Sequence, residues 1–341
     1  MTPRPLPRFN VVRTIPVGIN PTGVTANPRK NEIYVVNTDS NNVSIIDAER
    51  NQVSATIGVH GRPYFVDVAP DGRRAYVANS GSRNVSVIDL DRRQVVANIR
   101  VGAAPGLARV APDGASVVVS NRSDDNLSII DAGGGRVRAT VPVCKQPEDI
   151  AILPDNSKAF IACASSGQVA AVDLKEAKLL ALLDVGKTPV NLALKPDGGE
   201  IAVANFDSNN ISMIETTTNE VGSSYLIGTH PARGVVSADS SRLYVSNFGS
   251  NTVAVYDIDN GKVISSLPVG DHPDALALSA SEDYLLVVDA GSGDVAVIEK
   301  RQPTKLEPGE YGLLTITQVG LQPNNIAVKA FRLSKPVAPA H

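Results

Sequence analysis

The hydrophobic and polar positions of this chain follow a pattern that returns about every 42 residues. The stretch "YVANSGSRNVSVID" at 76–89 has close counterparts in "YVVNTDSNNVSIID" at 34–47 and "YVSNFGSNTVAVYD" at 244–257. The position that ends each unit recurs at steps of 42 residues, followed by a last step of 50; it falls at Gly18, His60, Gly102, Cys144, Gly186, Gly228, Gly270 and Gly320. The chain is therefore expected to hold seven complete repeats and the start of an eighth.

Each repeat contains four short apolar runs that predict four β-strands. In the second repeat these runs are "FVDVA" (65–69), "AYVAN" (75–79), "VSVID" (85–89) and "QVVANIRVG" (94–102). The turn sequences "PDG" and "SGSRN" separate the first three runs, as expected for an antiparallel meander. Four strands in a period of about 40 to 45 residues are typical of a β-propeller blade, whose two apolar faces must be covered by neighbouring blades.

The sequence therefore predicts an all-β, seven-bladed β-propeller of four-stranded antiparallel blades, with the strand after each repeat's proline innermost. Residues 1–10 are expected to form an N-terminal extension, 11–332 a single propeller and 333–341 a C-terminal tail. Two segments could supply the last outer strand, "NVVRTIPVG" (10–18) and "LLTITQVG" (313–320). We favour closure of the ring by the N-terminal segment, with the C-terminal segment lying along the last blade.

Polar residues recur in register at two strand ends. An acidic residue closes the third strand of every repeat, at Asp47, Asp89, Asp131, Asp173, Glu215, Asp257 and Glu299. An asparagine ends the second strand at Asn37, Asn79, Asn121, Asn205 and Asn247. Seven acids could suggest seven ion sites, but Asp and Glu at a strand end can accept hydrogen bonds from the backbone of the next turn. We interpret both sets as structural.

Composition narrows the functional classes. Lys and Arg number 32 against 35 Asp and Glu, a net charge of -3 with the two signs mixed along the chain. Such a balance gives no electrostatic basis for nucleic-acid binding. The most apolar run, "LLALLDV" from Leu179, falls far short of the roughly 18 residues of a membrane span, so no membrane insertion is expected. The start, "MTPRPLPRFN", lacks the apolar segment of a secretory signal, so we expect either a cytoplasmic protein or one whose signal has been removed.

Candidate binding residues gather in the loops that lead from the outer strand of one blade to the inner strand of the next. Such loops converge near the channel of a propeller. The candidates are His60, Arg62, Tyr64, Phe65, Glu148, Asp149, Asn191, His230, Arg233, His272 and Asp274. Three of the four histidines are among them, yet they come from different blades, too far apart for metal bonds near 2 Å, so no metal or cofactor is expected. Ordinary solvent-exposed loop residues are the alternative interpretation.

The two cysteines, Cys144 and Cys163, match no zinc-binding spacing. If the first hairpin of the fourth repeat turns at "PDNS" (154–157), Cys163 lies opposite Glu148, and Cys144 lies four residues further along the entering loop. A disulfide needs Cα atoms within about 7 Å, which that register does not provide unless the loop folds back. Two free thiols are therefore expected, with Cys163 as a small buried substitute for asparagine.

The motifs resemble those of YVTN-type seven-bladed β-propeller repeat proteins, a group that includes YncE-like proteins and surface-layer propellers of bacteria and archaea. The motifs that carry the resemblance are "YVVN", "YVAN", "VVSN" and "YVSN", the "PDG" turns, and "VG" followed by a proline, over residues 11 to 299. The resemblance implies an extracytoplasmic bacterial protein, in the periplasm or secreted. Because these are packing motifs, they do not specify an activity.

The leading hypothesis is a non-enzymatic, monomeric propeller that presents its channel face to a small ligand or a protein partner. Arg233 and Arg62 are expected to matter most, since guanidinium groups bind carboxylates in a two-point fashion. The resemblance also leaves open an enzyme of lactonase or lyase type with its site at the channel mouth. A surface-layer or adhesion module is a third possibility.

Overall fold

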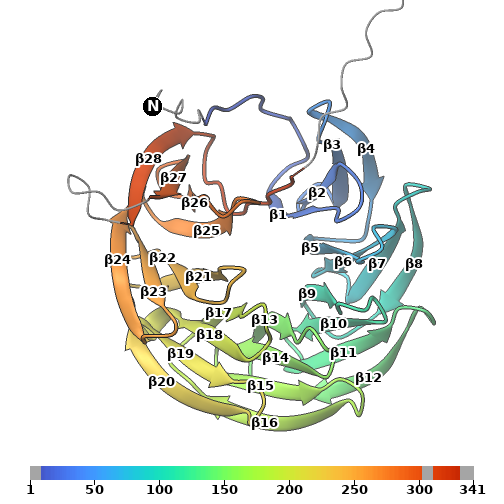
Figure 1. Ribbon diagram of the computed structural model, residues 1–341. Coiled ribbons are helices and arrows are strands. Elements are labelled where there is room, and N and C mark those ends of the chain that lie inside the picture. The colour runs from blue at the N-terminus through green and yellow to red at the C-terminus, as the bar shows by residue number, and fades with distance from the viewer. Residues whose placement is uncertain (1–8, 302–309, 331–341) are drawn as a thin grey trace, which may run out of the picture.

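The computed structural model describes residues 9–301 and 310–330. Seven four-stranded antiparallel sheets follow one another around a channel, so the predicted seven-bladed all-β propeller is confirmed (Figure 1). Every inner strand begins at the proline of its repeat, as expected from the sequence. The described residues contain no helix long and apolar enough to cross a bilayer.

In each blade the strands run outward from the channel in chain order. Blade 1 comprises β1 (Pro21–Ala26), β2 (Glu32–Asn37), β3 (Asn42–Asp47) and β4 (Gln52–Gly58). Blade 2 comprises β5 (Pro63–Val68), β6 (Arg74–Asn79), β7 (Asn84–Asp89) and β8 (Gln94–Arg100). Blade 3 comprises β9 (Pro105–Val110), β10 (Ser116–Asn121), β11 (Asn126–Asp131) and β12 (Arg136–Pro142). Blade 4 comprises β13 (Pro147–Ile152), β14 (Lys158–Cys163), β15 (Gln168–Asp173) and β16 (Lys178–Asp184).

Blade 5 comprises β17 (Pro189–Leu194), β18 (Glu200–Asn205), a short 3-10 turn (Phe206–Ser208), β19 (Asn210–Glu215) and β20 (Glu220–Leu226). Blade 6 comprises β21 (Pro231–Val236), β22 (Arg242–Asn247), β23 (Thr252–Asp257) and β24 (Lys262–Pro268). Blade 7 comprises β25 (Pro273–Leu278), β26 (Tyr284–Asp289), β27 (Asp294–Lys300) and β28 (Tyr311–Gln318).

The hydrophobic core is divided among the junctions between consecutive blades. Between blades 1 and 2, for example, the buried side chains of Tyr34 and Val36 pack against Val66 and Val77. A corresponding cluster fills each junction from blades 1 and 2 through to blades 6 and 7. Consecutive residues of a central strand face opposite neighbouring blades, and both sets of side chains are buried. Both faces of a blade are therefore apolar, which accounts for near-continuous runs such as "AYVAN".

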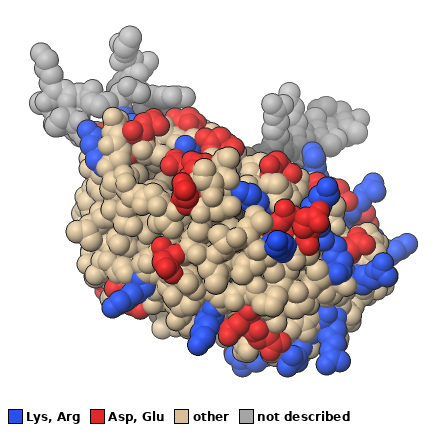
Figure 2. All heavy atoms as spheres, turned by 90° about the horizontal axis from the view of Figure 1, so that it is seen from below, with Lys and Arg blue, Asp and Glu red and all other residues tan. Residues whose placement is uncertain are grey.

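The outer edge of the ring carries charges of both signs. Figure 2 shows Lys and Arg interspersed with Asp and Glu, separated by wide areas with neither, in keeping with the net charge of -3. The outer strand β16 leaves Leu180 and Leu182 partly exposed on this edge. No strongly basic or acidic face is evident in this view, so the edge offers no electrostatic attraction for a polyanion.

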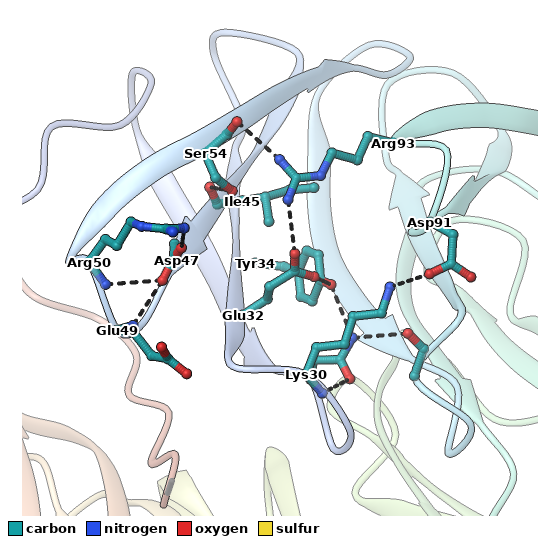
Figure 3. Close-up of polar contacts among 12 residues, drawn as sticks. Lys30, Glu32, Tyr34, Ile45, Asp47, Glu49, Arg50, Ser54, Asp91 and Arg93 are labelled. Atoms are coloured by element: carbon teal, nitrogen blue, oxygen red, sulfur yellow. Dashed lines mark hydrogen bonds and ion pairs between the residues drawn. The ribbon is translucent and has the colours of Figure 1, made fainter. Parts of the chain in front are cut away.

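Six of the seven acids at the ends of the third strands accept backbone hydrogen bonds from the turns that follow, which supports their structural interpretation, whereas Glu299 contacts the side chain of Arg301. In blade 1, Oδ1 of Asp47 accepts hydrogen bonds from the backbone N–H groups of Glu49 and Arg50 (Figure 3). The same view shows how blades 1 and 2 are joined by ion pairs, with Arg93 reaching Glu32 at 3.1 Å. The hydrogen bond from the Arg50 backbone lowers the pKa of Asp47, which fits a permanently charged turn acceptor.

A glycine–asparagine contact closes most blades at the end of the second strand. In blade 1, Nδ2 of Asn37 donates to Oδ1 of Asn42 and to the hydroxyl of Ser44. The loop glycine lies directly against this asparagine: a Cβ placed on Gly18 would lie 2.6 Å from Cβ of Asn37. The blades that follow the same rule pair Gly102 with Asn121, Gly186 with Asn205 and Gly228 with Asn247.

Blade 4 replaces that contact with a disulfide, so the prediction of free thiols is wrong. Cys144 occupies the loop-glycine position and Cys163 the asparagine position, and their Cα atoms are 5.6 Å apart. The simple hairpin register failed because a bulge lies between Pro147 and Asp149, and Pro147 rather than Glu148 pairs with Cys163. The loop therefore folds back over the strand end, as the loop glycine does in the other blades.

Closure of the ring also differs from the prediction. The C-terminal strand β28, not the N-terminal segment, completes blade 7 by pairing with β27 from Asp294↔Gln318 to Lys300↔Tyr311. Residues 9–17 form no strand. The N-terminal pattern matches an outer strand, but β28 follows β27 in the chain and takes the available edge. The connecting residues 302–309 lie outside the described part of the chain.

Blade 7 carries a second variation on the Gly–Asn contact. Asp289 and Asp294 stand where blades 1, 2, 3 and 5 have two asparagines, and both are buried. Among the described residues, no hydrogen-bond donor reaches either carboxylate oxygen of Asp289 or Oδ1 of Asp294. Burial, together with the neighbouring Asp294, raises the pKa of Asp289 from 3.8 to about 7. A proton on this pair replaces the amide donor of the other blades.

We expect the Cys144–Cys163 bond to stabilise the protein. It closes a loop with a sequence separation of 19, for which chain entropy gives about 3 kcal/mol. Reduction should lower the free energy of unfolding by about 2–4 kcal/mol, measured by denaturant titration. The double variant Cys144→Gly/Cys163→Asn restores the contact of the other blades and should be insensitive to reductant. Two reactive thiols in the unreduced, unfolded protein would contradict the bond.

The Asp289 pair should make stability depend on pH. Its pKa in the folded protein is higher than in the unfolded chain, so its stabilising effect is fully present below about pH 4 and is lost as the pH rises to about 7. Asp289→Asn supplies an amide donor to Asp294 and should stabilise the protein by about 1–3 kcal/mol at pH 8. The measurement is the difference in unfolding free energy between variant and parent from pH 4 to 8. A difference that does not grow with pH would rule out a shared proton.

Candidate functional site

A cavity of about 280 Å³ lies at the channel, walled by the inner strands. Its lining is formed by Thr22, Val24, Thr25, Tyr64, Phe65, Leu107, Arg109, Arg122, Glu148, Asp149, Val190, Arg233, Asn325 and Ile326. Most of these residues follow the repeat proline by one to four positions, because this part of each inner strand faces the channel. The cavity is mixed in character, because charged and aliphatic side chains both contribute to its wall.

Two arginines in the cavity are held by carboxylates and aromatic rings. Arg122 reaches Glu148 at 2.8 Å, and its guanidinium lies 4.2 Å from the ring centre of Tyr64. Arg109 lies 3.8 Å from Asp149 and 4.6 Å from the ring centre of Phe65. The rings of Tyr64 and Phe65 are thus covered by arginines of blade 3. These cation–π contacts fix the guanidinium groups and leave little of the ring faces free.

Asp149 and Asn191 connect the inner strands of three blades. Oδ2 of the buried Asp149 accepts hydrogen bonds from Nδ2 of Asn191 at 2.8 Å and from the backbone of Leu192 at 3.0 Å. Asn191 in turn accepts a hydrogen bond from the backbone N–H of Gly234 in the next blade at 2.8 Å. These two side chains therefore connect blades 4, 5 and 6 around the channel. Any role of Asp149 in ligand binding would be in addition to this structural role.

Arg233 is the cavity arginine without a described side-chain partner. Within the described residues, no carboxylate lies within 4 Å of its guanidinium and no hydrogen bond involves it. Its backbone N–H donates a hydrogen bond to the Ser246 hydroxyl, which fixes the position of the residue on β21. Burial raises the pKa of Asp274, and the charge of Arg233 partly offsets that rise. Arg233 thus contributes an unpaired positive charge to the cavity.

The structure divides the predicted site residues into two groups. Those that line the cavity are Tyr64, Phe65, Glu148, Asp149 and Arg233. Those outside its lining are His60, Arg62, Asn191, His230, His272 and Asp274.

The histidines and Arg62 lie in the loops beyond the inner strands. His60 contacts Asn84 of its own blade at 2.7 Å. His230 stacks on Phe206 and His272 lies against Phe248, each with ring centres 4.5 Å apart. The guanidinium of Arg62 is largely exposed and lies 3.8 Å from Asp39. These residues lie in the predicted loops, but their side chains do not line the cavity.

Arg109 and Arg122 are site residues that sequence reasoning missed. Arg109 lies four positions after Pro105, where other repeats have Thr, Asp, Ala or Val, and Arg122 directly follows Asn121. The sequence analysis considered only the loops between blades, whereas both arginines lie in a strand or directly after one. The signal that could have found them is an arginine at a repeat position otherwise occupied by small or apolar residues.

Larger hollows exist on the opposite face, among the turns that join first to second and third to fourth strands. One of about 550 Å³ lies between blades 2 and 3, around Arg74 and Asp89, and another of about 360 Å³ lies between blades 4 and 5, around Lys158. Similar hollows at separate junctions indicate a feature of blade packing. The channel cavity instead joins residues of six blades at one place, which makes it the better candidate for a site.

No three His, Cys, Asp or Glu side chains in the described ranges are placed to hold one metal ion. The charged groups of the cavity are arginines and their carboxylate partners. Such a set is suited to recognising charge and shape in a ligand.

Three family models, all similar to propeller or propeller-like domains, match different parts of the chain. The model of YNCE-like beta-propellers matches residues 104–263, that of the cytochrome D1 heme domain matches 27–149, and that of the 7-bladed lactonase propeller matches 224–310. No curated protein matches this chain. The resemblance inferred from the repeat motifs is thus confirmed at the level of fold and motif.

Two solved structures share the fold over most of this chain. Hydrazine synthase of Kuenenia stuttgartiensis is similar with a TM-score of 0.68 at 19% identity, covering 86% of this chain and 99% of that one. A functionally unknown protein from Desulfotomaculum acetoxidans has a TM-score of 0.68 at 20% identity, covering 87% and 98%. At such identities the likeness shows the fold alone.

We expect Asp149 to be more important for stability than its place in the cavity suggests. Asp149→Ala should destabilise the protein by about 2–4 kcal/mol, because Asn191 and Leu192 lose a buried acceptor and Arg109 its counter-charge. Asp149→Asn retains an acceptor oxygen and should cost less. Thermal and denaturant unfolding of both variants provide the measurement. Equal effects of the two substitutions would contradict the role of the hydrogen bonds.

Proposed function

We propose that this protein is a non-enzymatic binding propeller that takes a small anionic ligand into the channel cavity, with Arg233 as the main charged contact. The observation that supports it is the unpaired guanidinium of Arg233 in a cavity where Arg109 and Arg122 are already neutralised. Arg233 is partly buried, and among the described residues its guanidinium has no side-chain hydrogen-bond partner, so a ligand carboxylate or similar anion would supply the missing acceptors.

The charge balance of the cavity agrees with an anionic ligand. Among the lining residues, three arginines and two carboxylates, Glu148 and Asp149, leave one net positive charge (3 − 2 = 1), although Asp274 and Asp67 behind the lining also interact with Arg233 and Arg109. The volume of about 280 Å³ lies just below the usual range for small-molecule sites. The ligand should therefore be small, with one anionic group directed at Arg233.

The aliphatic residues of the lining indicate that part of the ligand is apolar. Val24, Leu107, Val190 and Ile326 provide aliphatic contact area beside the charged groups. A compact carboxylate with an apolar portion can contact both the charged and the aliphatic residues of the cavity. A protein partner could offer the same chemistry through an exposed carboxylate side chain or C-terminus.

The alternative of a lactonase- or lyase-like enzyme has weaker support from the cavity. Glu148 and Asp149 are each held by an arginine, and Asp149 also accepts backbone and amide hydrogen bonds. A general base needs a carboxylate free to take a proton, and neither residue is placed in that way. The match to a lactonase model concerns residues 224–310 and bears on the fold.

We further propose that the protein functions in an oxidising compartment outside the cytoplasm. The Cys144–Cys163 disulfide supports this, since such bonds persist chiefly in secreted and periplasmic proteins. Trapping of thiols in the producing cells tests it: the native protein should carry the bond. Two alkylated cysteines at the moment of lysis would contradict this location.

Replacement of Arg233 tests the binding role. Calorimetric titration with a panel of small aliphatic and aromatic carboxylates should find at least one that binds at a 1:1 ratio. Arg233→Ala should then weaken that binding by about 1.5–3 kcal/mol, or about 10- to 150-fold, with little change in the melting temperature.

The control for this experiment is Arg62→Ala. Arg62 is an exposed arginine in an inter-blade loop, outside the cavity, and its removal changes the overall charge by the same amount. It should leave carboxylate binding unchanged. If Arg233→Ala destabilises the fold and spares affinity, Arg233 holds the channel together instead, and the proposal fails.

A further inference from the structure

After the seventh blade, the chain contains the start of an eighth repeat. In every repeat the residue before the proline adopts a left-handed backbone conformation, with φ between 47° and 57°. The residues are Asn20, Arg62, Ala104, Gln146, Thr188, His230, His272 and Gln322. Gln322, with φ of 49°, shows that the loop before Pro323 has the same geometry as the seven loops that lead into complete blades.

Residues 323–328 occupy the place of an eighth inner strand. Asn325, two positions after Pro323, lines the cavity just as Phe65 and Leu107 do two positions after their own prolines. The segment is fastened to blade 1 by hydrogen bonds from Asn324 to the carbonyl of Pro21 and from Lys329 to the carbonyl of Asn27. Figure 1 shows this end of the chain passing between β25 and β1.

The N-terminal segment supplies the counterpart of an outer strand. Residues 10–16 read as the outer-strand pattern of the other repeats, yet they form no strand, and Val12 is 85% exposed. Phe9 packs against the ring of Tyr284 at the edge of blade 7, with ring centres 4.9 Å apart. Figure 1 shows the segment crossing the space between blades 7 and 1. Inner and outer elements are thus present, and the two central strands are missing.

The apolar faces that border this position are incompletely covered. Among the residues that the structure describes, six hydrophobic clusters fill six junctions, and none joins blade 7 to blade 1. Ile33 and Val35 of β2, with Leu286 and Val295 of blade 7, are only half-buried.

Their counterparts in the other blades are almost entirely buried. The counterparts of Val35 are Val77, Val119, Ile161, Val203, Val245 and Val287. The counterparts of Leu286 are Tyr34, Tyr76, Val118, Phe160, Ala202 and Tyr244. None of these side chains is more than 4% exposed, so the exposure is a property of this junction alone.

We propose that the position between blade 7 and blade 1 binds a β-hairpin of a partner protein, which supplies the two central strands of an eighth blade. The hairpin would add its edges to residues 323–328 and 10–16 by β-augmentation and cover the apolar faces on both sides. This site is separate from the channel ligand proposed above and does not depend on it.

Residues 331–341 are too short to provide these strands. The turn, second strand, second turn and third strand of blade 1 span Asn27–Asp47, which is 21 residues, whereas residues 331–341 number 11. Those residues also include Pro336 and Pro339, and proline cannot donate a ladder hydrogen bond. A second copy of this chain is no better a source, since its central hairpins are already built into blades.

The surroundings define the chemistry of the partner hairpin. A central pair of strands lies between two blades, so both of its faces become buried. The partner should therefore present two runs of about six residues, rich in Val, Ile and Ala on both faces and joined by a short polar turn, as β6 and β7 are.

The test uses a synthetic peptide with the sequence of residues 73–90, the central hairpin of blade 2, as the probe. It should bind the full chain at a 1:1 ratio and slow amide hydrogen exchange in residues 10–17 and 323–330. The same peptide with prolines in place of Val77 and Val87 should not bind. Val35→Asp in the protein should weaken binding at least tenfold, because a charge then faces the buried side of the hairpin.

Val96→Asp is the matched control. Val96 lies on the outer strand β8 and is 46% exposed, so the same substitution is made on a partly exposed valine away from the junction. Melting curves verify that both variants are folded. The proposed site is supported if Val96→Asp leaves the affinity for the peptide unchanged while Val35→Asp weakens it.

Three results would overturn the proposal. One is the absence of probe binding and of slowed exchange. Another is binding that appears only after deletion of 331–341, because the tail would then be the occupant. The third is sedimentation of the free protein as a dimer that dissociates with Val35→Asp, because a second copy would then cover the junction. Arg233→Ala should leave probe binding unchanged, which separates this outcome from that of the channel.

Discussion

A blade that is apolar on both faces cannot exist by itself, and the rest of this structure depends on that constraint. Side chains of β2 and β3 such as Tyr34 and Val43 become fully buried only because blade 2 packs against them. The same requirement passes from blade to blade around the channel, so stability is shared among junctions rather than concentrated in one core. It also makes the junction between blades 7 and 1 conspicuous, because the requirement is not met there.

The repeat made the fold predictable. A constant spacing of 42 residues located every inner strand at its proline and every turn acid at its strand end, since identical local sequences in identical surroundings fold alike. Prediction failed in two places. The bulge that follows the proline of each repeat was not visible in the sequence, and the register it sets brings Cys144 to Cys163. The edge of β27 is taken by β28 and not by the N-terminal segment, although both have the outer-strand pattern.

The site was harder to predict than the fold, for a related reason. Loop residues such as His60 and Arg62 were easy to notice, yet neither lines the cavity. Arg109 and Arg122 stand within strand patterns and became visible only when the blades were placed around the channel. The Gly–Asn contact behaves in the same way: its replacement by a disulfide in blade 4 and by two carboxyl groups in blade 7 could be interpreted only with the geometry.

The channel and the open junction share one structural element. Residues 323–330 contribute Asn325 and Ile326 to the cavity wall, and they are held to blade 1 mainly by two side-chain hydrogen bonds. A hairpin that paired with this segment would fix its position and with it one wall of the cavity. Ligand binding in the channel would by the same contacts favour the arrangement that the hairpin needs, since coupling between two binding sites is reciprocal. The two proposed sites are therefore independent in their chemistry but joined through a segment whose order both of them would increase.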